Sequence, residues 1–182
     1  MRKLALALAA ALLLLLTACG EEQTSEITLH YTLSISCETL AQNPEQCREE
    51  KRAYLPQSGM LLPETELEVP RGTSVYDALQ RACREAGIPL DAAWTALYKS
   101  AYVKGIGNLY EFDGGKDSGW MYSVNGEFPN YGCSQYILEE GDAVRWVYTC
   151  DLGRDVGDDY QEKAQKQMKQ RKEYDKNKDH TV

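Results

Sequence analysis

The stretch TSVYDALQRACREAGI, residues 73–88, decides the fold class, because it predicts the clearest amphipathic helix of the chain. Ser74 can cap the free backbone amides at its start, together with Asp77 three residues later. Gly87 is a typical C-terminal cap, and Pro89 prevents the helix from continuing. Apolar side chains recur between these caps at the spacing of one helix face: Val75, Ala78, Leu79, Ala82, Cys83 and Ala86. Such a face must lie on a sheet.

Strand patterns stand on both sides of this helix. Residues 27–36, ITLHYTLSIS, alternate strictly between apolar and polar side chains, which is typical of a half-buried strand. His30 falls on the polar face and is expected to be solvated. Residues 60–70, MLLPETELEVP, predict a second strand, in which Pro63 favours an edge position. Residues 143–149, AVRWVYT, predict the last strand, with its two aromatic residues on one face.

Shorter elements are expected between these strands. Residues 97–112, LYKSAYVKGIGNLYEF, predict two short strands around Gly105 and Gly107. Residues 119–126, GWMYSVNG, alternate and end in Asn-Gly, which predicts a strand entering a tight turn, because Asn and Gly accept the positive φ of such turns. Residues 37–58 predict a charged loop.

Runs of strands with a single amphipathic helix are typical of an α+β domain of two layers. We therefore predict a β-grasp-like two-layer domain, in which one amphipathic helix packs on a mixed sheet. In that arrangement the first and the last strand lie side by side at the centre.

The N-terminal residues are expected to lie outside this domain. Positive charge at Arg2 and Lys3 precedes an apolar run of 13 residues, Leu4 to Leu16, which is too short for a spanning helix. The residues that follow, LTAC at 16–19, resemble the bacterial lipobox. This resemblance implies a lipoprotein signal peptide over residues 1–18. It also implies acyl chains such as palmitate on Cys19 and a tether over residues 19–26, so that the domain is extracytoplasmic and anchored to the bacterial cell membrane. An ordinary cleaved signal peptide with an accidental Cys19 is the alternative.

The charge balance and the residue types argue against several functions. The chain has 20 Lys and Arg residues and 28 Asp and Glu residues, and removal of Arg2 and Lys3 leaves 18 against 28, a net charge of −10. Such a charge disfavours nucleic acid and electrostatic adhesion to anionic lipid. His30 and His180 are the only histidines, and the motifs of metalloproteases, serine hydrolases and phosphate-binding loops are missing from the sequence. We therefore expect no enzymatic activity and no required cofactor or metal.

Five cysteines remain once Cys19 is assigned to lipid: Cys37, Cys47, Cys83, Cys133 and Cys150. Cys83 falls on the apolar face of the predicted helix and is expected to be a buried thiol. The other four allow three disulfide connectivities. Sequence proximity favours Cys37 with Cys47 and Cys133 with Cys150. A bridge between Cys37 and Cys150 is the alternative if their strands are neighbours.

The C-terminal residues 154–182 are rich in both charges and predict a tail that is helical, from about 159 to 173, or disordered. Acidic residues gather here and before the last strands: Glu111, Asp113, Asp117, Asp151, Asp155, Asp158 and Asp159. Calcium is a weak alternative for them, because their spacing does not match the EF-hand loop, and solvated acidic turns are the expectation.

Three stretches carry a resemblance to a known family. They are residues 73–88, quoted above, residues 101–113, AYVKGIGNLYEFD, and residues 118–153, SGWMYSVNGEFPNYGCSQYILEEGDAVRWVYTCDLG. Together they resemble a bacterial lipoprotein family of unknown function that is related to the C-terminal β-domain of transcobalamin and intrinsic factor. The resemblance covers residues 27–153, the expected domain. Relatives often carry a cysteine near Gly114, where this chain has none, so Cys47 is a candidate to replace the missing partner.

The resemblance implies a ligand. In the animal carriers this domain closes over one face of the corrin ring, and a larger helical barrel holds the other face. It therefore implies capture of cobalamin or a related tetrapyrrole, either weakly alone, as a dimer, or with a second protein such as a transporter component. The binding residues that it implies are Trp120, Tyr122, Asn130, Tyr131 and Tyr136. Strand alternation also fits Trp120 and Tyr122 as core residues, so Tyr131 and Tyr136 are expected to be the more exposed.

Protein recognition is the alternative function. A lipid-anchored module with exposed tyrosines and free sheet edges can dock another surface protein by strand pairing or through an aromatic patch, without a small-molecule ligand.

Overall fold

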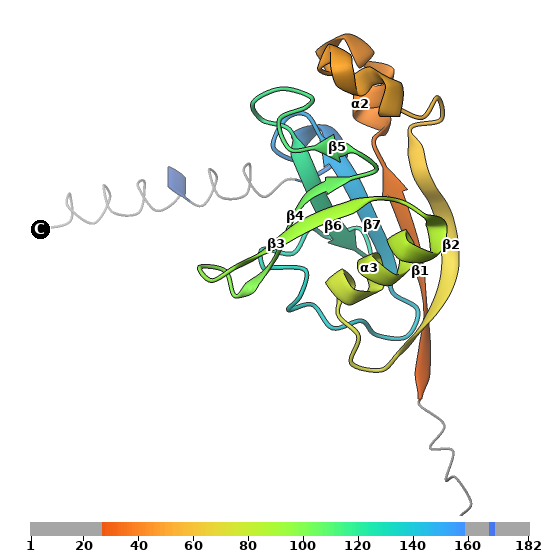
Figure 1. Ribbon diagram of the computed structural model, residues 1–182. Coiled ribbons are helices and arrows are strands. Elements are labelled where there is room, and N and C mark those ends of the chain that lie inside the picture. The colour runs from red at the N-terminus through yellow and green to blue at the C-terminus, as the bar shows by residue number, and fades with distance from the viewer. Residues whose placement is uncertain (1–26, 159–167, 170–182) are drawn as a thin grey trace, which may run out of the picture.

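The computed structural model of the chain describes residues 27–158 and 168–169 (Figure 1). The expected signal peptide, the lipidated Cys19 and the tether lie outside the described residues, as does most of the helix expected at 159–173. Met168 and Lys169 are helical. Within the described ranges no helix is both long and apolar enough to cross a membrane.

A mixed four-stranded sheet forms the centre of the domain (Figure 1). Its strands follow the order β2 (Met60–Pro70), β1 (Thr28–Ser36), β7 (Ala143–Thr149) and β6 (Gly119–Val124). β1 and β7 pair in parallel at the centre, and β2 and β6 pair antiparallel with them at the edges. The predicted α+β class, the central pairing of first and last strands and the edge position of residues 60–70 are confirmed. The name β-grasp stays a prediction.

A second, three-stranded sheet was not expected. It contains β3 (Leu90–Thr95), β4 (Ser100–Ile106) and β5 (Leu109–Tyr110) in that order. The two short strands around Gly105 and Gly107 are confirmed, whereas the expectation of a single sheet is wrong. The missed strand β3 contains an Asp and two Ala residues, which are depleted in strands, so its own strand signal is weak. It forms because it pairs with β4 across a hairpin.

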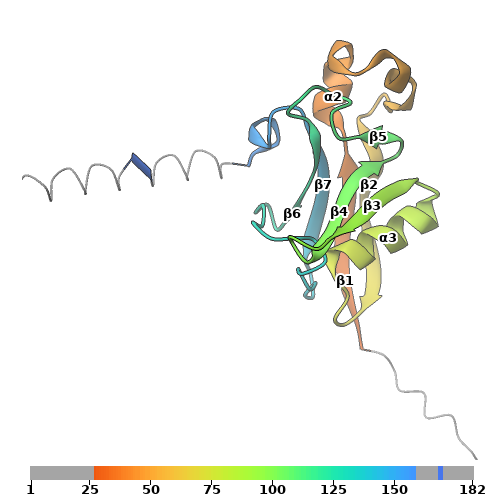
Figure 2. The same cartoon turned by 60° about the vertical axis from the view of Figure 1, so that its left-hand side comes forward.

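The helix α3 (Val75–Ala86) has the predicted bounds and caps. The Ser74 hydroxyl accepts a hydrogen bond from the Asp77 amide at 3.1 Å, and Gly87 ends the helix with φ 67°. Five of the six predicted apolar positions are buried, including Cys83, and only Ala86 is exposed. Figure 2 shows α3 lying against the larger sheet.

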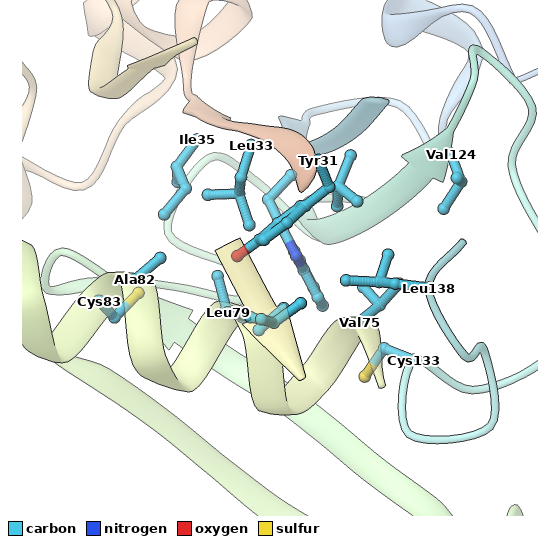
Figure 3. Close-up of a cluster of buried hydrophobic side chains, with 14 of the residues drawn as sticks. Tyr31, Leu33, Ile35, Val75, Leu79, Ala82, Cys83, Val124, Cys133 and Leu138 are labelled. Atoms are coloured by element: carbon cyan, nitrogen blue, oxygen red, sulfur yellow. The ribbon is translucent and has the colours of Figure 1, made fainter. Parts of the chain in front are cut away.

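The main core lies between α3 and the larger sheet (Figure 3). Tyr31, Leu33 and Ile35 point from β1 toward Leu79 and Ala82 of the helix. Strand β4 adds Val103 and Ile106 to the same core, so the smaller sheet also covers this side of the domain. The exposed face of β1 carries His30, which lies 3.3 Å from the Glu68 carboxylate and is solvated as expected.

A second core cluster lies at the other end of the domain and contains Cys37, Leu40, Cys47, Leu109 and Tyr148. Residues 37–58, predicted as a loop, cover it with the short helices α2 (Glu38–Gln42), η1 (Pro44–Gln46) and η2 (Glu49–Tyr54). The buried Tyr148 hydroxyl donates to the Tyr110 carbonyl at 2.6 Å, and burial raises the pKa of Tyr148 to about 12.

Several of the acidic residues named in the sequence analysis have protein partners within the described residues. The buried Asp113 carboxylate accepts from the Tyr110 amide at 2.8 Å and lies 3.8 Å from the Arg48 guanidinium and 3.7 Å from the Lys51 ammonium. Asp155 accepts from the Cys150 amide at 2.7 Å. Within the described residues no group of three or more His, Cys, Asp or Glu side chains could hold a metal ion.

All five described cysteines are free thiols in this structure. The predicted pairing of Cys133 with Cys150 is wrong, because Cys133 is buried in the main core and Cys150 borders the second core cluster. Cys37 and Cys47 share the second core cluster, so a disulfide between them stays a prediction, as does the alternative with Cys150.

The folded chain continues past residue 153, where the tail was expected to begin. A short 3-10 helix, η3 (Arg154–Val156), follows β7, and the Asp158 amide donates to the Gly153 carbonyl at 2.9 Å. The described domain therefore extends to Asp158.

Substitution of Gly59 by Ala is expected to destabilise the fold more than the same substitution at Gly72. Both glycines have positive φ, 71° and 88°, which alone disfavours Ala by about 1 kcal/mol. A Cβ at Gly59 would also lie 2.7 Å from the Glu38 Cα, so the backbone must move, whereas at Gly72 nothing lies within 4 Å. Urea denaturation should show a loss of roughly 3 kcal/mol for Gly59→Ala. Equal losses for the two variants would contradict this packing.

Candidate functional site

An open cleft of about 350 Å³ lies along the edge strand β6. Three segments form its walls: β6 itself, the chain after the Asn-Gly turn, and the end of the described domain. The lining residues are Met121, Tyr122, Phe128, Pro129, Asn130 and Asp158.

The Asn-Gly turn directs the chain back along β6. Val124 and Glu127 exchange backbone hydrogen bonds of 2.9 and 3.0 Å, and Asn125 and Gly126 have φ of 54° and 84°. The Asn125 side-chain amide also donates to the Asp142 carboxylate at 2.8 Å. The predicted tight turn is therefore confirmed, but β6 pairs with β7 and not with the chain that follows the turn. The returning chain is free to form the wall of the cleft.

Tyr122 connects the cleft to the main core. Its hydroxyl donates to the Tyr131 carbonyl at 2.8 Å, and its ring lies 5.5 Å from the ring of the buried Trp146. Burial raises the pKa of Tyr122 well above the usual value of 10.0. The phenol therefore remains protonated and keeps donating this bond over the physiological pH range.

A tyrosine face, made of Tyr122, Tyr131 and Tyr136, continues from the cleft. The rings of Tyr131 and Tyr136 are stacked at 5.9 Å and 10°, and Tyr136 stands edge-on to Tyr122 at 6.4 Å. Tyr131 is 47% exposed, as expected, whereas Tyr136 is half-buried against the main core. The outer surface of the stack is therefore presented by Tyr131.

Trp120 lies apart from this site. Its indole N–H donates to the Leu109 carbonyl at 2.9 Å, and its ring meets Tyr148 edge-on at 5.2 Å. It packs against both core clusters and does not line the cleft. The structure thus brings together Tyr122, Asn130, Tyr131 and Tyr136 of the predicted ligand residues and leaves Trp120 in a packing role.

Four lining residues were not predicted: Met121, Phe128, Pro129 and Asp158. Phe128 and Pro129 follow the Asn-Gly turn directly, so the turn signal could have indicated them. Asp158 has no local signal, because it reaches the cleft only through the turn after β7. Gly153 makes that turn possible with φ 92°, since a Cβ there would lie 2.7 Å from the Asp158 Cβ and 3.1 Å from the Met121 Cε.

This arrangement suits a flat molecule that is apolar over most of its surface and carries polar donors at its rim. Met121, Phe128 and the tyrosine rings offer apolar area, and Asn130 and Asp158 offer an amide and a carboxylate at the border. An open aromatic cleft with one carboxylate at its border offers a bound molecule both apolar contact and a polar group that can orient it.

A second exposed apolar feature is the tip of the β3–β4 hairpin, where Trp94 is 66%, Leu97 82% and Tyr98 66% exposed. The Gln135 side-chain amide donates to the Tyr98 carbonyl at 3.3 Å, so this tip is connected to the loop that carries Tyr131 and Tyr136. The tip projects from the body of the domain (Figure 1).

In structure the chain is similar to haptocorrin, solved in complex with Cbi, with a TM-score of 0.52 and 12% sequence identity. This match covers 70% of the chain but 26% of haptocorrin, so the chain spans about a quarter of that protein, and the likeness is one of fold. A protein from Ruminococcus gnavus ATCC 29149, provisionally described as metal-binding, shares 14% identity at a TM-score of 0.40, over 66% of this chain and 96% of that one.

Residues 72–150 match the family described as a domain of unknown function, DUF4430. The predicted resemblance to the transcobalamin-related family is thereby confirmed. Comparison with curated proteins gives no significant sequence match.

The Tyr122 hydroxyl is expected to hold the loop that carries Tyr131. Tyr122→Phe removes the bond to the Tyr131 carbonyl, so the free energy of unfolding should fall by about 1 kcal/mol. Amide hydrogen exchange should accelerate in residues 128–136 and remain unchanged in α3. Tyr131→Phe keeps both the stacked ring and the Tyr122 bond, so it is the matched control. Equal exchange in the two variants would show that the bond does not order this loop.

Proposed function

We propose that this chain is an extracytoplasmic binding protein that captures a corrinoid or a related flat tetrapyrrole at the cleft beside β6. One observation carries the proposal. Tyr122 and Asn130 line a common cleft, and Tyr131 and Tyr136 extend it as a stacked pair, although these residues come from a strand and an irregular loop. The likeness in fold to haptocorrin, solved in complex with Cbi, supports the choice of ligand class.

The chemistry of the cleft fits such a ligand. Aromatic rings offer rigid flat area with little rotamer entropy to lose, and burial of one such ring against a macrocycle contributes on the order of 2 kcal/mol. The amide groups at the rim of a corrin can donate to the Asp158 carboxylate and exchange hydrogen bonds with the Asn130 amide. The net negative charge of the chain disfavours anionic partners and is compatible with a ligand whose rim is neutral.

The openness of the cleft has a consequence for affinity. A cleft of about 350 Å³ covers part of one face of a corrin-sized molecule and leaves the other face in water. We therefore propose that capture is weak by this domain alone and is completed by a second copy or a second protein, such as a transporter component, on the opposite face of the ligand.

The N-terminal sequence supports the placement of the domain. We propose that residues 1–18 are removed, that Cys19 carries acyl chains, and that residues 19–26 tether a β-grasp-like domain to the outer side of the bacterial membrane. In this role the chain is a binding protein without a catalytic centre or a resident cofactor.

Protein recognition is the second candidate function, and the β3–β4 hairpin favours it. Trp94, Leu97 and Tyr98 expose apolar surface at one tip, and contiguous exposed aromatic residues are typical of protein interfaces. A surface or adhesion partner that engages this tip would need no small-molecule ligand.

Titration of residues 21–182 with cobalamin, cobinamide and haem tests the proposal. We expect saturable heat with the corrinoids at tens of micromolar, about tenfold weaker for Tyr131→Ala and for Asn130→Ala. Tyr54→Ala is the matched control, because Tyr54 is exposed on η2, within the segment that covers the second core cluster, and does not line the cleft. An equal loss in the control would place binding elsewhere. No saturable heat with any of the three molecules would contradict capture by this domain and leave protein recognition as the function.

A further inference from the structure

Three cysteine thiols lie in or beside the second core cluster, although they come from separate parts of the sequence. Cys37 follows β1, Cys47 follows η1, and Cys150 follows β7. Cys37 and Cys47 belong to the cluster, and Cys150 packs against it. Cys83 and Cys133 belong to the main core and take no part in this group.

The three thiols differ in their access to solvent. Cys37 and Cys47 are 0% and 2% exposed, whereas Cys150 is half-buried. A soluble oxidant or reductant can therefore reach Cys150 but not the other two. A Cβ at Gly114 would lie 3.2 Å from the Cys150 sulfur and 3.1 Å from the Tyr148 ring, so the sulfur lies beside the second core cluster.

Thiol–disulfide exchange in this group should be slow, and charge on one of its thiols affects the pKa of the others. Burial raises the pKa of Cys37 to about 12 and that of Cys150 to about 11. Charge on Cys47 raises the pKa of both of these thiols further. Exchange needs a thiolate, so its rate should be low at neutral pH and rise with pH.

The backbone holds the buried pair in place. The Cys37 amide donates to the Gly59 carbonyl at 2.7 Å, and the Cys47 amide donates to the Pro44 carbonyl at 3.2 Å. A disulfide between Cys37 and Cys47 would link the residue before α2 to the residue after η1. Because both cysteines are buried, this disulfide would be shielded from soluble reductants.

We propose that Cys150 is the entry thiol of an exchange relay that oxidises the buried pair Cys37 and Cys47. The Cys150 thiolate attacks a small soluble disulfide, forms a mixed disulfide and releases one small thiolate. The Cys47 thiolate then attacks the Cys150 sulfur and displaces the second small thiolate. Finally, the Cys37 thiolate attacks the Cys47 sulfur, which forms the Cys37–Cys47 disulfide and returns Cys150 as a thiolate. In sum, two protein thiols lose two electrons, the small disulfide becomes two thiols, and the protons of Cys37 and Cys47 pass to the released thiols.

The relay is tested in the full chain carrying Cys19→Ser, which removes the one thiol outside the described residues. The reduced protein is mixed with oxidised glutathione, free thiols are alkylated at intervals, and the linked peptides are mapped by mass. We expect Cys37–Cys47 as the final bond with Cys150 free, and a transient glutathione adduct on Cys150. The rate should rise about tenfold per pH unit below the thiol pKa.

Two variants separate the relay from direct oxidation. Cys150→Ser should form the same final bond at least about tenfold more slowly, because the buried thiols must then wait for local opening. Cys83→Ala removes a buried thiol outside the group and should leave the rate unchanged. Circular dichroism confirms that each variant is folded. An unchanged rate in Cys150→Ser, a final disulfide that contains Cys150, or a glutathione adduct that persists on Cys150 would each overturn the proposal.

Discussion

The parallel pairing of β1 with β7 is the constraint on which the rest of the structure depends. These strands lie more than 100 residues apart in the chain, so the intervening chain must bring β7 back beside β1 at the centre of the sheet. α3 and the smaller sheet cover the apolar side of the pair and exclude water from it. Closing so long a loop has a cost in chain entropy, and burial of one apolar face along both central strands offsets this cost.

One face of β7 contributes a buried aromatic side chain to each of the two core clusters. Trp146 enters the main core and supports Tyr122 of the neighbouring strand, whereas Tyr148, two residues further, enters the second core cluster. The candidate cleft and the three-thiol group are therefore attached to the same rigid strand. An irregular segment borders each of them: the chain after the Asn-Gly turn forms one wall of the cleft, and residues 37–58 cover the second core cluster. A rigid strand that positions irregular binding segments is the usual division of work in binding domains.

The position of the cleft at a sheet edge matters for its function. β6 is paired on one side only, so the returning chain with Phe128 and Pro129 can lie beside it without breaking a strand ladder. The same openness would leave much of the proposed macrocycle uncovered, and this is the reason that the proposed function includes a second surface. The exposed hairpin tip, connected to the loop of Tyr131 by the Gln135 side chain, lies on a segment that a second surface could meet.

The sequence by itself determined the elements whose signals are local. The caps of α3 at Ser74 and Gly87, the alternation of β1 and the Asn-Gly turn each depend on neighbours within one or two turns of chain, so their bounds could be predicted. The resemblance to a family named Tyr122, Asn130, Tyr131 and Tyr136 together with Trp120. Strand alternation indicated that Trp120 and Tyr122 could both be core residues, but it could not distinguish one from the other. Only the tertiary structure decided that Trp120 faces the core clusters, that Asp158 lines the cleft, and that Cys133 lies apart from Cys150. The reason is physical. Strand order and register decide which face of a strand is buried and which distant turn lies beside it, and the local spacing of residues in the sequence does not determine strand order or register.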